Sequence, residues 1–227
     1  MSAAVILYGS RARGSGNVNS DVDILFSDSN GNIGTPREVN GVSMHQYPQK
    51  WLLNEAESGN LFVYHVGFEG VPLFDPDKFI DVLKSAFQFK DSYVDDVHLA
   101  NGIMDFVLFK PWGSRDCLRR RYFWSIRTII IASMAEARSP SFSAHELEAF
   151  SGVPGLESHI QHRHSATYED CRRFGSMVAD RFGLSGATGK HELLRAWLLS
   201  RGGIGEDTVR LLETHEAIEF GSMPHYQ

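Results

Sequence analysis

Hydrophobic and polar positions follow different patterns in the two halves of the chain. In the first third, short apolar runs at 3–8 and 22–26 flank a connection rich in Gly, Ser, Asn and Arg. Short, partly β-branched runs bounded by turn formers predict buried strands. A later stretch, 37–47, contains two further runs joined by Asn40-Gly41, the strongest short signal of a β-hairpin. We therefore expect a small β-sheet in this part of the chain.

From residue 77 onward the apolar positions recur at helical spacing, which predicts amphipathic helices. The expected segments are 79–87, 93–109, 116–137, 144–150, 168–182, 192–199 and 207–218. Earlier, 48–59 also has a helical pattern, and 61–66 is ambiguous between helix and strand. Asp75-Pro76 marks the expected boundary. The predicted fold class is α+β, with a small mixed β-sheet domain over residues 1–75 and a C-terminal α-helical bundle domain over residues 76–227.

Composition and charge narrow the partners and the compartment. The chain has 227 residues, a net charge of −6 and two cysteines. An acidic chain is poorly suited to coating nucleic acid, so a long nucleic acid is not expected as a partner. Two cysteines are too few for a disulfide framework, which indicates a reducing cytoplasm. The apolar N-terminus reads as a strand and not as a signal peptide, and no apolar run is long enough to span a bilayer, so we expect a cytoplasmic protein with no membrane partner.

The chemistry-bearing residues lie around the first two predicted strands. Gly9 and Ser10 form a tight turn whose backbone N–H groups are able to cradle an anion, and Arg11 and Arg13 add positive charge. Asp21 and Asp23 open the second strand. Because strand side chains alternate, the two carboxylates are expected side by side on one face, with Val22 pointing into the core. Paired carboxylates suit Mg²⁺, which binds through one or two of them and the phosphates of its substrate.

The stretch Gly9–Gly14 (GSRARG), followed by Ser20–Asp23 (SDVD), resembles the nucleotidyltransferase fold superfamily, the group that contains DNA polymerase beta. The form is most similar to the small bacterial minimal and aminoglycoside-type members. The resemblance implies transfer of a nucleoside monophosphate from Mg-NTP, with ATP as the expected co-substrate, to an acceptor hydroxyl on a small molecule or a protein. Two Mg²⁺ ions would be held by the catalytic Asp21 and Asp23.

One catalytic group of the resembled fold is absent from the sequence. Members carry a third carboxylate on the strand that corresponds to 42–47, facing the aspartate pair, and this strand has no acid. His45 is a candidate replacement as ligand or base, and Glu38 on the neighbouring strand is the nearest carboxylate. The alternative is that the third acid is lost. The chain would then be a degenerate member that binds a nucleotide or a partner protein, in the manner of an antitoxin, without catalysis.

Three further expectations complete the sequence interpretation. The helix over 116–137 carries Arg119–Arg121 on its surface and Arg127 in an apolar surrounding, where Arg127 is a candidate nucleotide ligand. His65 and Glu69 are interpreted as structural residues. Related domains carry a helix before the first strand, which here starts almost at Met1. That helix is either missing or supplied by a partner subunit, which leaves a homodimer open.

Overall fold

The computed structural model describes residues 2–16, 20–29, 31–111, 116–184 and 191–213. It is an α+β protein, as predicted, and its chain divides between Asp91 and Ser92 into two compact units. The first unit contains β1 (Ala4–Tyr8), α1 (Gly9–Ala12), β2 (Val22–Asp28), β3 (Arg37–Val39), β4 (Val42–Pro48), α2 (Gln49–Glu57), α3 (Leu61–Glu69), β5 (Val71–Phe74) and α4 (Phe79–Ala86). The second contains α5 (Val94–Val107), α6 (Asp116–Glu136), α7 (Ala144–Ser151), α8 (Leu156–Gln161), α9 (Tyr168–Arg181), α10 (His191–Arg201) and α11 (Gly203–Glu213).

The first unit is built on a five-stranded sheet with the order β3-β4-β2-β1-β5. Strands β2 and β4 pair in parallel, and the other neighbours pair antiparallel, so the sheet is mixed as predicted. The β3–β4 hairpin turns at Asn40 and Gly41, which have φ angles of 51° and 75°. Positive φ at both central residues is the geometry that an Asn-Gly pair adopts most readily.

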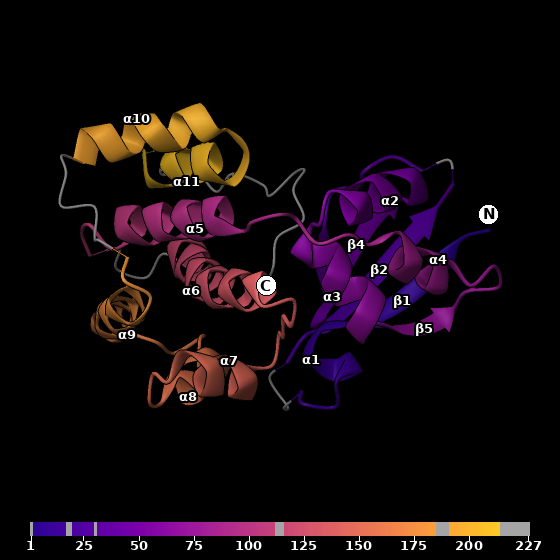
Figure 1. Ribbon diagram of the computed structural model, residues 1–227, viewed down its shortest axis with the longest axis horizontal. Helices are drawn as coiled ribbons and strands as arrows, with labels where there is room; N and C mark the ends of the chain where they lie inside the picture. The colour runs from indigo at the N-terminus through magenta and orange to yellow at the C-terminus, as the bar shows by residue number, and fades with distance from the viewer. Residues whose placement is uncertain (1, 17–19, 30, 112–115, 185–190, 214–227) are drawn as a thin grey trace. The chain divides into compact units, whose positions relative to one another are not determined.

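The two faces of this sheet differ in what covers them. One face carries Ile6, Leu25 and Tyr47, each no more than 2% exposed, and packs against α2 and α3 (Figure 1). Asp23 lies two residues before Leu25 on β2, so its side chain belongs to the same helix-covered face. The prediction that Val22 points into the core is wrong: Val22 lies on the opposite face, with Phe26 36% exposed.

An aromatic cluster holds α3 against the helix-covered face. The Phe62 ring meets the rings of Tyr8 and Tyr47 edge-on, with centroids 5.8 Å and 5.6 Å apart. Edge-to-face pairs add to the stabilisation from burial because the ring edge is electropositive and the ring face electronegative. Since Tyr8 is the last residue of β1, this packing also fixes the end of the strand from which the following turn departs.

Helices α3 and α4 bear on two sequence-based expectations: the ambiguous stretch at 61–66 and the domain boundary after Asp75. The ambiguous stretch at 61–66 is helical, and the Asn60 side chain caps α3 by accepting a hydrogen bond from the Phe62 N–H at 2.9 Å. Helix α4 packs against α2 and α3. Because α4 belongs to the first unit, the division between the two units falls after Asp91, later than the boundary expected after Asp75.

The second unit is helical and centred on α5 and α6, which pack along each other (Figure 1). Helices α10 and α11 pack against α5, while α7 and α9 pack against α6. The core face of α6 includes Ile126, Ile129 and Ile130, all fully buried. Helix α9 begins with a capping box, in which Thr167 and Asp170 exchange side-chain-to-backbone hydrogen bonds.

Details of this unit depart from the sequence pattern. Arg121, expected on the surface of its helix, is only 3% exposed, and burial lowers its pKa to about 10. The short helix α8 was not predicted. Helix α11 begins at Gly203, inside a glycine-rich stretch that reads as a loop, and the expected helical residues 214–218 lie outside the described part of the chain.

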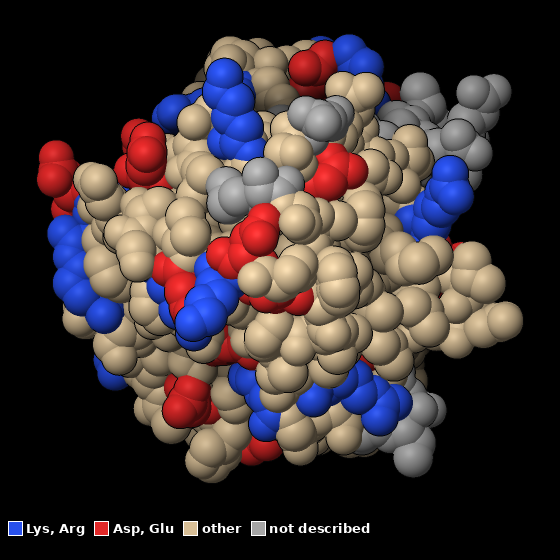
Figure 2. All heavy atoms as spheres, turned by 90° about the vertical axis from the view of Figure 1, so that its right-hand side faces the viewer, with Lys and Arg blue, Asp and Glu red and all other residues tan. Residues whose placement is uncertain are grey.

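Two features of the described part of the chain concern membranes and charged partners. Among the described residues, no helix is long and apolar enough to cross a membrane. On the face seen in Figure 2, Lys and Arg side chains are interspersed with Asp and Glu side chains and with wide uncharged areas.

We expect Phe62→Ala to lower the free energy of unfolding by about 3–5 kcal/mol, the range for removing a buried phenylalanine ring. Phe62 is 1% exposed and supports both Tyr8 and Tyr47. Urea denaturation followed by near-ultraviolet circular dichroism measures the loss. Phe68→Ala, on the same helix but 45% exposed, is the control and should cost about 1 kcal/mol or less. Equal losses in the two variants would contradict the packing described.

Candidate functional site

Four residues form a row across one end of the sheet. Tyr8 pairs with Asp23, Asp23 pairs with Ser43, and Ser43 pairs with Glu38 on the edge strand. Residues paired in register point to the same face, and neighbouring strands are about 4.8 Å apart. The parallel pairing of β2 and β4 thus places Ser43, and not His45, directly beside the Asp23 carboxylate.

The Asp23 carboxylate lies against Gly9, the first residue after β1. Gly9 has a φ of +77°, and a Cβ added to it would overlap Asp23 Oδ2 and lie 3.1 Å from Asp23 Cγ. The positive φ therefore favours glycine at this position, and any side chain here would have to displace the Asp23 carboxylate. The contact brings together the turn and the second carboxylate of the Asp-x-Asp pair, which are separated in the chain by the loop that precedes β2.

The aspartates supply a two-carboxylate donor set at the start of β2. Asp21 directly precedes the strand and, in an extended chain, falls on the same side as Asp23. Within the described ranges, no group of three or more His, Cys, Asp or Glu side chains is arranged to hold a metal ion. Two carboxylates fit an ion that completes its coordination with substrate phosphates and water, which is the usual mode for Mg²⁺.

His45 lies one row further into the sheet than Ser43. It is 3% exposed; its Nε2 shares a 3.2 Å hydrogen bond with the Ser43 hydroxyl, and its Nδ1 is buried with no hydrogen-bond partner. Burial lowers the pKa of His45 to about 4, so the ring is neutral at pH 7. The geometry connects His45 to the row through Ser43, and its predicted catalytic role stays a prediction.

Arg11 is hydrogen-bonded within its own loop. Its Nε and Nη2 both donate to the Ser20 carbonyl oxygen, at 3.2 Å and 3.0 Å. This double contact joins the turn after β1 to the residue that precedes Asp21. Arg11 thus ties the two ends of the site's loop together, and its predicted contact with a nucleotide remains untested.

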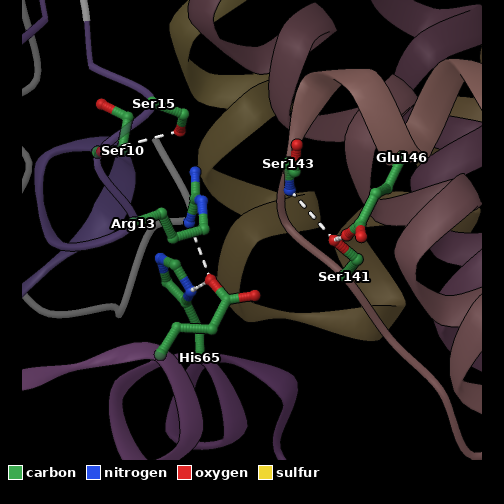
Figure 3. Close-up of polar contacts among 8 residues, drawn as sticks. Ser10, Arg13, Ser15, His65, Ser141, Ser143 and Glu146 are labelled. Atoms are coloured by element: carbon green, nitrogen blue, oxygen red, sulfur yellow. Dashed lines mark hydrogen bonds and ion pairs between the residues drawn. The ribbon is translucent and has the colours of Figure 1, made fainter.

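Arg13 is held by an acidic partner far away in the sequence. Its Nη1 donates to Glu69 Oε2 at 2.7 Å, and the same oxygen accepts a 2.8 Å hydrogen bond from His65 Nδ1. In Figure 3 the dashed lines from the Arg13 and His65 side chains meet at one carboxylate oxygen, which the two hydrogen bonds identify as Glu69 Oε2. Burial by itself would raise the pKa of Glu69, but the hydrogen bonds and charges of His65 and Arg13 hold it below its usual value.

The remaining predicted ligand belongs to a different part of the chain. Arg127 lies on α6, in the second unit, whereas Gly9, Ser10 and the aspartates lie in the first. Its proposed contact with a nucleotide stays a prediction.

Two residues near the row were not singled out as part of a site. Ser43 faces Asp23 only because β2 and β4 pair in parallel in this register, which the sequence does not reveal. Glu69 was interpreted as structural, and its contact with Arg13 spans 56 positions of the chain. The one local signal was the i, i+4 spacing of His65 and Glu69 on α3, which places them on one helix face.

Comparisons with known proteins add little to this geometry. No protein-family model matches the chain, and no curated protein matches it. Among solved structures, the chain is similar to a nucleotidyltransferase-like protein from Exiguobacterium sibiricum, with 13% identity over 95% of this chain and 75% of that one, and a TM-score of 0.30. A likeness at this level carries no argument about function.

The buried histidines predict a stability that falls in mild acid. Between pH 6.5 and about 4, His45 binds a proton in the unfolded chain but not in the folded one, so the free energy of unfolding decreases as the pH falls through this window. A shift of this size corresponds to roughly 3 kcal/mol as an upper bound. We expect His45→Gln to flatten the pH dependence measured by urea denaturation at pH 4.5, 5.5 and 7.

His159 in the second unit provides the matched control. It is also buried, and burial lowers its pKa to about 4; the Asp170 charge raises this pKa and the Arg173 charge lowers it, both by less than burial does. His159→Gln should flatten the dependence by a similar amount, and the double variant should flatten it further. An unchanged slope in His45→Gln would show that folding does not lower the pKa of His45.

Proposed function

We propose that the first unit transfers a nucleoside monophosphate from Mg-NTP, with ATP as the expected donor, to an acceptor hydroxyl. The observation that carries the proposal is the contact between the Asp23 carboxylate and Gly9. It joins an anion-binding turn and a metal-binding carboxylate at one point, which is what phosphoryl chemistry on a nucleoside triphosphate needs. The resemblance of the Gly9–Gly14 and Ser20–Asp23 stretches to nucleotidyltransferases supports it.

Each group of the site has a separate task in this proposal. Asp21 and Asp23 would hold Mg²⁺, for which the resemblance implies two ions, and the metal would supply positive charge that balances the triphosphate. Backbone N–H groups at Gly9 and Ser10, with the Ser10 hydroxyl, orient the β- and γ-phosphates. The turn thus positions the donor so that its α-phosphorus faces the acceptor.

The transfer itself requires one bond to form and one to break. The acceptor oxygen bonds to the α-phosphorus, the bond from that phosphorus to the oxygen bridging to the β-phosphate breaks, and pyrophosphate leaves. The acceptor proton passes to a base beside the row. His45 is neutral at pH 7 but only 3% exposed, like the Ser43 hydroxyl to which it is hydrogen-bonded. Because a serine hydroxyl is not a base at this pH, a carboxylate of the row is the better candidate to take the proton.

A second candidate function is nucleotide binding without transfer. It is favoured by Ser43, which stands in register with Asp23 on the strand where the resembled fold carries its third carboxylate. Glu38 lies in the same row, one strand further out, and is exposed. If Glu38 does not replace the missing acid, the site keeps its phosphate and metal groups but has no third carboxylate to activate the acceptor.

We expect Asp23→Asn to reduce pyrophosphate release from ATP by at least about 100-fold, because it removes a charged metal ligand at the reacting phosphate. Pyrophosphate release is measured with γ-labelled ATP, and transfer of the nucleotide with α-labelled ATP, against a panel of small-molecule and protein acceptors. Asp28→Asn removes the same charge from the other end of β2 and should keep near-normal activity. An Asp23→Asn variant with full activity would contradict the proposed role.

Calorimetry with Mg-ATP separates the two candidate functions. Binding together with pyrophosphate release supports transfer. Tight binding to the unchanged protein without release for any acceptor favours the binding function, and absence of binding contradicts both.

A further inference from the structure

The Arg13–Glu69–His65 contacts form a mostly buried charge network beside the glycine turn. The side chains of Arg13 and Glu69 are 17% and 19% exposed, and that of His65 is 5% exposed. One carboxylate oxygen accepts from both Arg13 and His65. Ion pairs on an open surface contribute little because solvent screens them, whereas this pair lies in a largely desolvated position where its geometry matters.

Glu69 is the carboxylate that holds the Arg13 side chain in the described contacts. The Nε of Arg13 is buried and has no hydrogen-bond partner, and Glu69 is the ionic partner of its Nη1. A guanidinium that is mostly removed from water needs a compensating charge, so without Glu69 its side chain would be driven toward solvent. Glu69 is in turn fixed by the buried His65.

The network reaches the glycine turn by two routes. The Arg13 backbone N–H donates to the Gly9 carbonyl oxygen at 3.3 Å, so Arg13, the residue that follows α1, is directly bonded to the residue against which Asp23 lies. The His65 ring meets the Tyr8 ring edge-on with centroids 5.6 Å apart, and Tyr8 precedes Gly9 in the chain. Helix α3 therefore supports the turn from both sides of Gly9.

We propose that Glu69 is a positioning residue for the nucleotide site. It holds Arg13, and through the backbone of α1 the Gly9–Ser10 turn, in the arrangement that receives the polyphosphate, and His65 orients the Glu69 carboxylate. The inference rests on the proposed function, since it assigns a task within the same site. It changes the interpretation of Glu69 from a residue that only stabilises the fold to one that determines nucleotide affinity.

A double-mutant cycle on Mg-ATP affinity tests this role in the full chain. Calorimetry gives the Kd of the unchanged protein, Glu69→Gln, Arg13→Gln and the double variant, at a temperature where each remains folded by circular dichroism. We expect Glu69→Gln to weaken binding about tenfold, as loss of supporting contacts behind a binding site often does. Because Glu69 acts through Arg13, the double variant should bind no more weakly than Arg13→Gln alone.

Two further measurements separate positioning from simple stabilisation. Glu55→Gln is the matched control: Glu55 accepts a 2.7 Å hydrogen bond from Asn60 at the start of α3, and its loss should leave the Kd unchanged. Where pyrophosphate release is measurable, Glu69→Gln should raise KM for ATP more than it lowers kcat. A variant that melts earlier but binds Mg-ATP with the normal Kd would overturn the positioning role.

The outcomes also distinguish this inference from the function on which it rests. Failure of the unchanged protein to bind Mg-ATP would overturn the proposed function and the positioning role together. Normal binding by the unchanged protein with equal affinity in Glu69→Gln would overturn the positioning role alone. Effects of Glu69→Gln and Arg13→Gln that simply add in the double variant would show that Glu69 does not act through Arg13.

Discussion

The structure around the first strand depends on one close contact: the Asp23 carboxylate from β2 occupies the space beside Gly9 where a side chain would be. The positive φ of Gly9 independently favours glycine, and any other residue here would also have to displace that carboxylate. The antiparallel pairing of Tyr8 with Asp23 produces the contact. The aromatic packing of Tyr8 on Phe62 holds that pairing in place from the helical side. The packing that holds the end of β1 therefore also holds Gly9 beside Asp23, the two residues at the centre of the candidate site.

Two groups of charged side chains lie near the contact between Asp23 and Gly9. The carboxylates of Asp21 and Asp23 lie at the start of β2, and a second carboxylate–arginine–histidine group supports the turn from α3. In the second group the charge of Arg13 is already balanced by Glu69, so Arg13 is not a free surface cation. If the turn binds phosphate as proposed, this arrangement organises it in advance and lowers the ordering cost of binding.

Local sequence signals predicted the elements that depend on local physics. The Asn40-Gly41 hairpin, the α+β class and the amphipathic helices follow from turn chemistry and periodicity, and the structure contains all three. Which face of β2 is covered does not follow from alternation alone. Val22 is flanked by two acids and looks like the core position, but the helices lie on the aspartate side. Likewise, Arg121 is buried because of how the helices pack against one another, which its own neighbours in the sequence do not reveal.

Within the candidate site, too, some features follow from local sequence and others from contacts between distant segments. The turn and the Asp-x-Asp pair are readable from the sequence because each is a short motif. Ser43 beside Asp23, and Glu69 beside Arg13, depend on strand register and on helix packing between distant segments. These are the contacts that bear on whether the site catalyses transfer or only binds.

The most direct test of the central claim is to locate a bound divalent ion. Mn²⁺ replaces Mg²⁺ in the presence of a non-hydrolysable ATP analogue, and paramagnetic broadening of backbone amide signals is measured by NMR. The proposed site predicts that broadening is strongest at Gly9, Ser10 and the residues around Asp23, and that the signals of Ala4 and Ser27, which pair at the opposite end of β1 and β2, are broadened much less. Broadening centred elsewhere, or none at the glycine turn, would contradict it.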